Sequence, residues 1–477
     1  MKDPVVRPIS VILLLAGLFI STRAQAGFMP SQAQILADVA LANNHFTNEW
    51  PVPGCTSCLP GAHGSSIWTR ATYIEGALAL YRLNQDPNLY NYAVKWATFT
   101  NWSIRFGDTD TTSDDQGAGQ DYIELYQFDT TQTNRLVHIV NNANYWMSHH
   151  TGLSTMTYVD TLHMSMPTFM KLSVLNSNVL STLKTNYTYP AQMYSWFHNI
   201  KSVWGRSNGL YNLGDHLWWR DTNFMANYTA SDGTKSKCYW SRGNGWAFAA
   251  LARSMDVLPT NDPHYAEYLQ TFTEMAAALK AAQRPDGFWN VNLGYTNDYP
   301  GPESSGTACF VYGMAWGINH GYLDRATHLP VVISGWNALA VSALHHGSGA
   351  DAGFLGYEQS TGSKPADGQP VTYTSMPDFD DFGLGLFLLA GSQVYQLSSS
   401  DGVLLAAPAV ADDQVQLPFT VISSQTNATL DLLQTDELGT DWTTNTAAML
   451  TTNDGISYSF TVSGGASNRF YRVQLDP

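Results

Sequence analysis

Positive charge is scarce in this chain. Its 477 residues include 23 lysines and arginines against 39 aspartates and glutamates, which gives a formal net charge of −16. A surface of that sign repels nucleic acids and anionic membranes, so neither is an expected partner. An acidic sugar would also be repelled at long range, and an anionic substrate would therefore need a local cluster of arginines or other donors.

Cysteine is scarce as well, with only Cys55, Cys58, Cys238 and Cys309. The C-x-x-C spacing of the first two suits a redox or metal pair, but a second pair or histidines at ligand spacing are missing from the sequence. A local disulfide is the favoured interpretation for an exported protein, and neither a metal nor another cofactor is expected. Cys238 and Cys309 are consistent with buried small apolar residues.

Apolar runs long enough to span a bilayer are absent. The best candidate, residues 9–20, is short, follows Lys2 and Arg7, and precedes a small-x-small sequence at 24–26. This pattern is typical of a secretory signal peptide, so we expect residues 1–26 to be removed and the mature protein to be secreted or periplasmic, without a membrane partner. An uncleaved anchor is the alternative.

Several signatures of other enzyme classes are missing: a glycine-rich phosphate loop, an HExxH zinc pair and an EF-hand calcium loop. Aromatic residues, in contrast, are abundant, with 15 Trp and 25 Tyr. Aromatic platforms beside hydrogen-bonding side chains suit sugar rings, although aromatic residues also fill large cores. A carboxylate-based sugar hydrolase is the class of enzyme that fits best.

Helical periodicity dominates from about residue 31 to 397, and we expect residues 27–397 to form one catalytic domain of paired helices closed into a ring. Apolar residues recur at three- and four-residue spacing in segments 35–42, 71–83, 122–128, 162–174, 246–257, 265–282 and 329–344. After a predicted linker at 398–411, alternating runs predict a small antiparallel β domain at 412–477, with an accessory role.

Two aspartates stand in settings that suit acid–base chemistry. Asp114 lies in a polar run just before a predicted helix, and Asp160 lies between apolar and aromatic neighbours. A partly desolvated carboxyl binds its proton more tightly and can act as a general acid near neutral pH. Helix capping is the alternative role for both residues.

Cations and indoles are combined in two further segments, 217–221 and 239–246, and another indole follows in 284–290. A guanidinium fork suits a sugar carboxylate, and indoles can cover the faces of sugar rings. A salt bridge between Arg220 and Asp221 is the alternative for the first segment. The candidate substrate-binding residues are Trp219, Arg220, Trp240, Arg242, Trp246 and Trp289.

The run YWSRGNGW at 239–246, with RPDGFW at 284–289, PESSGT at 302–307 and GINHG at 317–321, resembles glycoside hydrolase family 105. These are the unsaturated rhamnogalacturonyl hydrolases, which are related to the unsaturated glucuronyl hydrolases of family 88. The resemblance extends from about residue 65 to 397 and leaves out the C-terminal β domain.

The resemblance implies an (α/α)6 barrel without a metal or cofactor. It also implies removal of a 4,5-unsaturated uronic acid, of the galacturonyl type, from the non-reducing end of lyase-generated rhamnogalacturonan oligosaccharides. In such a reaction Asp160, in its D-x-x-x-M pattern, would protonate the C4=C5 double bond before water adds at C5, with Asp114 as the second important carboxyl. Trp240, Arg242 and Trp246 match the family's substrate-contacting segment, but many members carry histidine where this chain has Arg220.

Three alternatives stay open. The chain could be an unsaturated glucuronyl hydrolase that acts on ulvan or glycosaminoglycan fragments, or a non-catalytic sugar-binding toroid. It could also be an ordinary inverting glycosidase, which needs two carboxyls about 6.5–9.5 Å apart.

Overall fold

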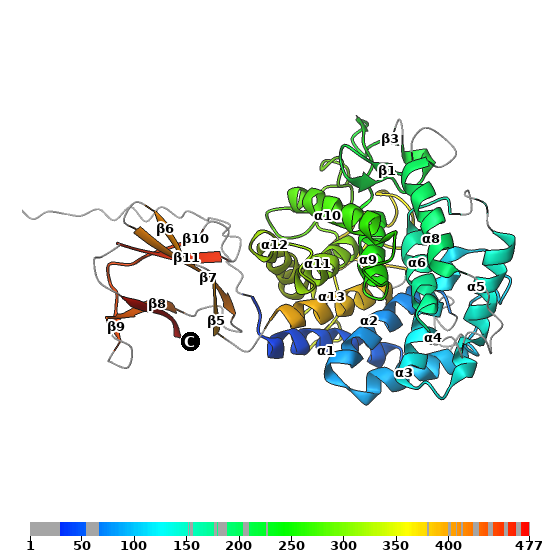
Figure 1. The fold of residues 1–477 in the computed structure, drawn as a ribbon, viewed down its shortest axis with the longest axis horizontal. Coiled ribbons are helices and arrows are strands. Elements are labelled where there is room, and N and C mark those ends of the chain that lie inside the picture. The colour runs from blue at the N-terminus through cyan, green and yellow to red at the C-terminus, as the bar shows by residue number, and fades with distance from the viewer. Residues whose placement is uncertain are drawn as a thin grey trace, which may run out of the picture.

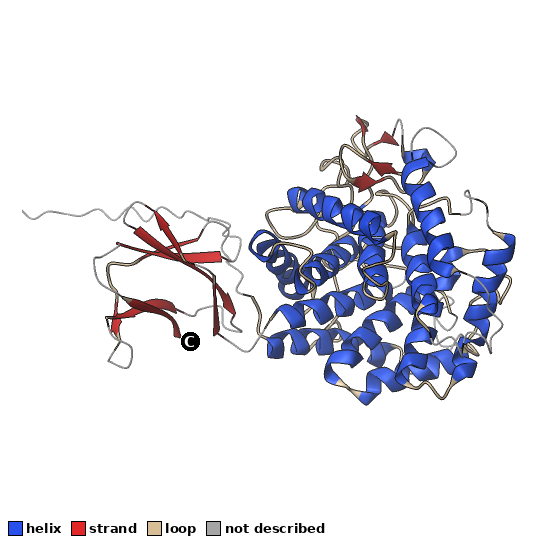
Figure 2. Ribbon diagram, in the orientation of Figure 1, coloured by secondary structure: helices blue, strands red, loops and turns tan. Residues whose placement is uncertain are grey.

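Helices dominate the chain up to residue 398 and strands dominate the rest, as a computed structural model shows (Figures 1 and 2). The structure describes residues 29–53, 66–150, 152, 156–175, 179, 188–203, 209–225, 228–378, 381–398, 402–406, 408–411, 414–422, 429–436, 442–452, 457–463 and 469–476. The predicted signal peptide and the pair Cys55 and Cys58 lie outside these ranges. No helix within them has the length and apolar character that a membrane crossing requires.

Every segment with helical periodicity lies mainly in a helix. Segments 162–174 and 246–257 run one and two residues past the ends of their helices, and 329–344 ends just after a π-helical turn at Ala338–Ala343. Several helices begin at a polar cap: the Ser31 side chain accepts from the backbone N–H of Gln34, and Glu303 accepts from two backbone N–H groups. The helices are α1 (Gln32–Glu49), α2 (Trp68–Asn84), α3 (Pro87–Phe99), α4 (Gly117–Phe128), α5 (Val137–His149), α6 (Asp160–Ser173), α8 (Tyr189–His198), α9 (Ser241–Met255), α10 (Tyr265–Ala282), α11 (Ser304–Asn319), α12 (Arg325–Asn337) and α13 (Asp381–Leu397).

Six of these helices contact one another in succession. The order is α2, α4, α6, α9, α11 and α13, and α13 contacts α2 again. Their residues are buried on nearly all sides, whereas α1, α3, α8, α10 and α12 each contact one or two of the six and keep an exposed face. A helix buried all round belongs to the interior, so the helical body has an inner and an outer layer.

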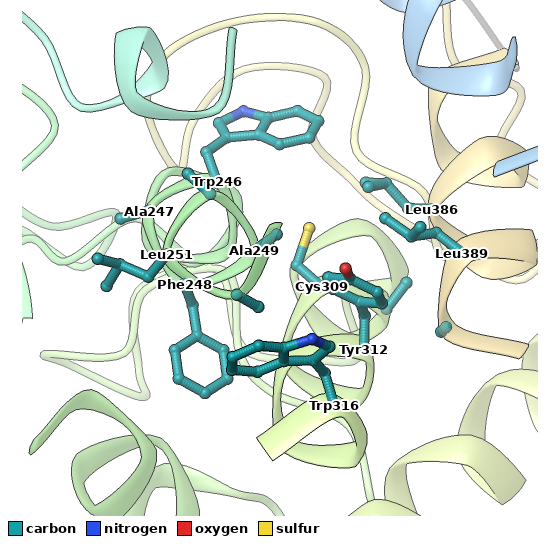
Figure 3. Packing of buried hydrophobic residues seen from close by; sticks show 14 of the residues in the cluster. Trp246, Ala247, Phe248, Ala249, Leu251, Cys309, Tyr312, Trp316, Leu386 and Leu389 are labelled. Atoms are coloured by element: carbon teal, nitrogen blue, oxygen red, sulfur yellow. The ribbon is translucent and has the colours of Figure 1, made fainter. Parts of the chain in front are cut away.

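Close packing of the inner helices depends on glycines. A Cβ atom at Gly76 in α2 would lie 2.0 Å from the carbonyl oxygen of Gly385 in α13. A Cβ atom at Gly245 in α9 would lie 2.7 Å from Cβ of Cys309 in α11. Figure 3 shows Ala249 and Cys309 at this α9–α11 contact, with Trp246 at one end of the cluster. Gly245 of the 239–246 run therefore serves helix packing.

Several charged side chains inside the helical body are paired, which offsets the cost of their burial. Glu75 forms an ion pair with Arg253, with an N–O distance of 2.8 Å, and its other carboxylate oxygen lies 3.1 Å from Nε2 of His163. The ring of His163 packs against Trp246, with ring centroids 4.7 Å apart. This buried network therefore holds the His163 ring against which Trp246 packs.

The C-terminal strands are all antiparallel and form two sheets. The first has the order β10-β11-β7-β5, with β6 also paired to β7, and the second has the order β12-β8-β9. Alternating residues such as Tyr458, Phe460 and Val462 point into a separate small core. The strands are β5 (Gly402–Leu405), β6 (Ala409–Ala411), β7 (Gln414–Ile422), β8 (Thr429–Thr435), β9 (Thr443–Thr444), β10 (Met449–Thr452), β11 (Ser457–Ser463) and β12 (Phe470–Asp476).

One expectation from the sequence needs correction. The predicted linker at 398–411 contains β5 and β6, which both pair with β7, so the β structure begins earlier than residue 412. Two short hairpins also precede α9: β1 (Tyr211–Asn212) with β2 (Leu217–Trp218), and β3 (Tyr228–Thr229) with β4 (Lys235–Ser236). Such short strands carry too few residues to produce a visible alternation in the sequence.

Candidate active site

A cavity of about 290 Å³ brings most of the predicted site residues together. It lies at the N-terminal ends of α2, α6 and α9 and beside the turn that precedes α4. Helix N-termini carry partial positive charge, which favours an anionic ligand there. The lining residues are Trp68, Asp114, Asp160, Met164, Arg220, Trp240, Arg242, Trp246, Thr361, Gly362 and Ser363.

Asp160 is the first residue of α6 and its carboxyl is held by Arg220. The backbone N–H of Val159 donates to the carbonyl of Arg220 at 2.8 Å, which fixes the two segments side by side. Nε of Arg220 donates to Oδ2 of Asp160 at 3.1 Å, and Nη1 donates to Oδ2 of Asp221 at 2.9 Å. Arg220 thus forms the predicted pair with Asp221 and a second pair with the candidate acid.

Neither candidate carboxyl caps a helix. Val159 occupies the N-cap of α6 and Gln116 that of α4, and neither cap has a side-chain hydrogen bond. Asp114 instead lies in the 3₁₀ turn Ser113–Gln116, where Oδ1 accepts a hydrogen bond of 3.1 Å from the hydroxyl of Tyr158. The capping alternative therefore has no geometric support at these positions.

The environment makes both carboxyls weaker acids. Burial raises the pKa of Asp160 above its ordinary value, while Arg220 and Arg242 act in the opposite direction. Burial, and next the negative charge of Asp160, raise the pKa of Asp114 to about 6, against a lowering by the Tyr158 hydroxyl. Two neighbouring buried carboxyls with raised pKa values are a common arrangement for acid–base chemistry.

The indole of Trp240 is fixed by a strap, residues 359–368, that crosses one side of the cavity. Nε1 of Trp240 donates to Oε1 of Gln359 at 2.9 Å. Nε2 of Gln359 donates to three strap carbonyls, those of Lys364, Pro365 and Asp367. Gln359 is fully buried, so this single side chain couples the indole to the strap residues that line the cavity.

Arg242 is held by the same strap rather than being free to rotate toward a ligand. Its terminal nitrogens donate to the carbonyls of Gln359 and Ser360 at 2.8 and 2.7 Å. Its guanidinium lies 4.7 Å from the Trp240 ring centroid and the residue is fully buried. Its Nε is buried and has no hydrogen-bond partner among the described residues.

Two predicted substrate contacts lie elsewhere. Trp289 is fully buried, and its Nε1 donates to the carbonyl of Leu279 at 2.7 Å, which makes it a core residue. Trp219 is half-buried and packs against Tyr239, with ring centroids 5.5 Å apart, outside the lining. Both tryptophans are close in sequence to motifs of the site, but this closeness did not place them in the cavity lining.

Sequence reasoning missed several residues that line or support the cavity. Trp68 starts α2 and Met164 lies one turn after Asp160, and the second could have been found from its helical spacing. The strap residues 361–363 and Gln359 carry no recognisable motif. Their role follows only from the hydrogen bonds that connect them to Trp240 and Arg242.

Metal ligation finds no support in the part of the chain that the structure describes, where no group of three His, Cys, Asp or Glu side chains could hold an ion. Cys238 and Cys309 are buried free thiols, as expected, and burial raises the pKa of the Cys309 thiol well above its ordinary value.

A buried carboxyl pair, arginines and indoles around one cavity of a helical body are characteristic of a carbohydrate-active protein. The family model described as Glycosyl Hydrolase Family 88 matches residues 35–398, and the chain belongs to this family. The resemblance based on the sequence motifs is confirmed. The matching model is that of family 88, the relative of family 105.

Individual relatives agree with this assignment. The chain is 35% identical over 193 residues to an "Unsaturated 3S-rhamnoglycuronyl hydrolase" of Formosa agariphila, which is 40% of this chain and 48% of that protein. The chain spans about half the length of the curated relatives it matches.

Two solved structures share the fold. A family 88 glycosyl hydrolase from Bacteroides vulgatus has a TM-score of 0.65 and 29% identity, over 76% of this chain and 99% of that one. A possible family 105 member from Salmonella enterica has a TM-score of 0.58 at 17% identity, over 82% and 100% of the two chains, and supports the fold alone.

Proposed function

We propose that this chain is an unsaturated uronyl hydrolase, which removes a 4,5-unsaturated uronic acid from the non-reducing end of an oligosaccharide. The observation that carries the proposal is the buried pair Asp160 and Asp114 in a cavity lined with indoles and two arginines. A general acid must be protonated near the working pH, and the burial of Asp160 favours its protonated form.

The proposed reaction balances around Asp160. Its protonated carboxyl gives a proton to C4 of the double bond, and water forms a bond to C5. The proton that this water loses passes to the Asp160 carboxylate, which restores the acid. The product at C5 is a hemiketal. Its ring opening breaks the C5–O5 bond and leaves a ketone at C5 and a hemiacetal at C1, which collapses to the aldehyde and releases the next sugar as an alcohol. Burial keeps Asp160 a weak acid, and the charge of Asp160 in turn raises the pKa of the neighbouring Asp114.

We also propose the architecture and processing expected from the sequence. The closed succession of inner helix contacts supports an (α/α)6 barrel for residues 27–397, with the β domain as a non-catalytic accessory. Residues 1–26 act as a signal peptide that directs the protein out of the cytoplasm, to the periplasm or the medium. N-terminal sequencing of the exported protein tests this part, and a start before residue 27 contradicts it.

The substrate we favour is an unsaturated uronate attached to rhamnose in a rhamnose- and glucuronate-containing product, rather than the rhamnogalacturonan product first expected. The support is the name of the two curated relatives, unsaturated 3S-rhamnoglycuronyl hydrolase. Because C4 and C5 are both trigonal in the alkene, glucuronate and galacturonate give the same unsaturated ring. The distinction therefore rests on the anomeric linkage and the next sugar.

The test is a panel of lyase products from ulvan, glycosaminoglycans and rhamnogalacturonan, followed through the ultraviolet absorbance of the conjugated double bond. The proposed reaction consumes the alkene, so absorbance falls as the sugar is released. An ordinary inverting glycosidase would release sugar and keep the absorbance. A non-catalytic sugar-binding protein would do neither, and this outcome with every substrate would reject the proposal.

A further inference from the structure

Arg220 is partly exposed to the cavity, although it is paired with two carboxylates. It lines the cavity with 23% of its side chain exposed, whereas Arg242 is fully buried and bound to the strap. Its guanidinium lies 4.5 Å from the ring centroid of Tyr158, whose hydroxyl donates to Asp114. Arg220 is therefore the more accessible of the two lining cations, and it is in contact with the candidate acid.

We propose that Arg220 exchanges carboxylate partners: it holds Asp160 ionised in the free protein and releases it when the carboxylate of a uronic acid binds. The proposal rests on the proposed function, and it adds that the substrate's own charge switches the acid on. A neutral sugar of the same shape would leave Asp160 paired with Arg220 and unable to donate a proton.

The two carboxylates bound to Arg220 are not held equally. Asp221 also accepts the backbone N–H of Asn223 at 2.8 Å and forms a backbone bridge with Tyr158, so its position is fixed from several sides. Within the described part of the chain, the side chain that hydrogen-bonds the Asp160 carboxylate is that of Arg220. An incoming third carboxylate therefore competes with Asp160 rather than with Asp221.

The charges around Asp160 decide its response to this exchange. Arg220 and Asp221 face it from the loop after β2, Asp114 and Tyr158 from the turns before α4 and α6, and Arg242 from α9. A bound uronate neutralises Arg220 and adds a negative charge, and both changes favour the protonated form of Asp160. Arg242 stays fixed by its hydrogen bonds to the strap. The proton comes from solvent.

Calorimetry on the wild-type protein tests the exchange directly. A saturated uronosyl disaccharide lacks the double bond and is not consumed, so its binding can be measured in two buffers of different ionisation enthalpy. We call the saturated uronosyl disaccharide the acid ligand. When it binds, we expect the complex to take up a fraction of a proton from solvent, and this fraction should approach one at some pH between about 5 and 8. The methyl ester of the acid ligand, which has the same shape without the charge, should take up none.

A variant and a matched control complete the test. Arg220→Gln should lose most of the proton uptake, because Asp160 no longer has the cation that hydrogen-bonds its carboxylate and holds it ionised. Arg284→Gln is the control, since Arg284 is 24% exposed and pairs with Asp286 at 2.7 Å outside the cavity lining. The alkaline limb of kcat should lie at higher pH than that of kcat/KM in the wild type, and the two should converge in Arg220→Gln.

The outcomes separate this proposal from the proposed function. If lyase products are hydrolysed but the acid and the ester bind with equal proton uptake, the exchange is wrong and the function stands. If no lyase product is consumed while the acid ligand still takes up a proton, the function is wrong and the exchange stands. Failure of the acid ligand to bind overturns the exchange, whatever the hydrolysis assay shows.

Discussion

Replacing Asp160 with asparagine tests whether this carboxyl supplies the proton. Asparagine keeps the size of the side chain and can still accept a hydrogen bond from Nε of Arg220, which lies 3.1 Å from the native carboxylate. It has no proton to give to carbon. General acid–base catalysis contributes about 10²–10⁴-fold, so the barrier should rise by about 2.7–5.5 kcal/mol and kcat should fall accordingly.

Substrate affinity should hold or rise in this variant, because Trp240 and Arg242 stay in place and Arg220 loses a competing anion. Initial rates from the loss of alkene absorbance and calorimetric affinities for a saturated ligand measure the two effects separately. Asp160→Asn that keeps more than about a tenth of the wild-type kcat would remove Asp160 from the mechanism, since the smallest expected loss is about 10²-fold.

Asp221→Asn is the matched control for Asp160→Asn. Asp221 accepts from the same guanidinium at 2.9 Å, and its side chain is 13% exposed against 12% for Asp160. Asparagine at this position can still cap the turn at Asn223. If the loss of activity came only from disturbing Arg220, both variants would lose equally, whereas proton donation predicts that Asp221→Asn loses less than about tenfold.

Three further predictions follow from buried groups. Gln359→Leu leaves the indole N–H of Trp240 without its acceptor, which costs about 1–3 kcal/mol, and should raise KM by about tenfold or more in steady-state assays; an unchanged KM would contradict the role of the strap. Trp289→Phe loses the hydrogen bond to the Leu279 carbonyl and should lower the free energy of unfolding by about 1–3 kcal/mol in denaturant titrations, with KM unchanged. Burial raises the pKa of Asp121 well above its ordinary value of 3.8, so its contribution to stability is complete below that value and is lost as pH rises. Asp121→Asn should therefore be more stable than the wild type near about pH 8 and lose this advantage toward about pH 4, and thermal unfolding with the same pH dependence in both proteins would refute this.

Helix and strand positions could be predicted where the signal is local. Periodicity identified α2, α6, α9 and α10, because one face of each carries apolar residues at helical spacing. It did not single out α11 or α13, because small and apolar residues occupy nearly all sides of these two helices and their faces differ little in sequence. β5 and β6 are too short to alternate visibly, and pairing with β7 stabilises them as strands.

The sequence by itself determined which chemical groups were available for a site: two candidate carboxyls, and arginines close to tryptophans, in an acidic chain. Only the tertiary structure decided which of these groups meet. Arg220 reaches Asp160 across 60 positions, and Gln359 reaches Trp240 across 119. Such contacts depend on how helices pack, and packing is a property of the whole fold. For the same reason Arg242 binds a strap, Trp289 fills the core, and Arg220 holds the carboxyl proposed as the acid.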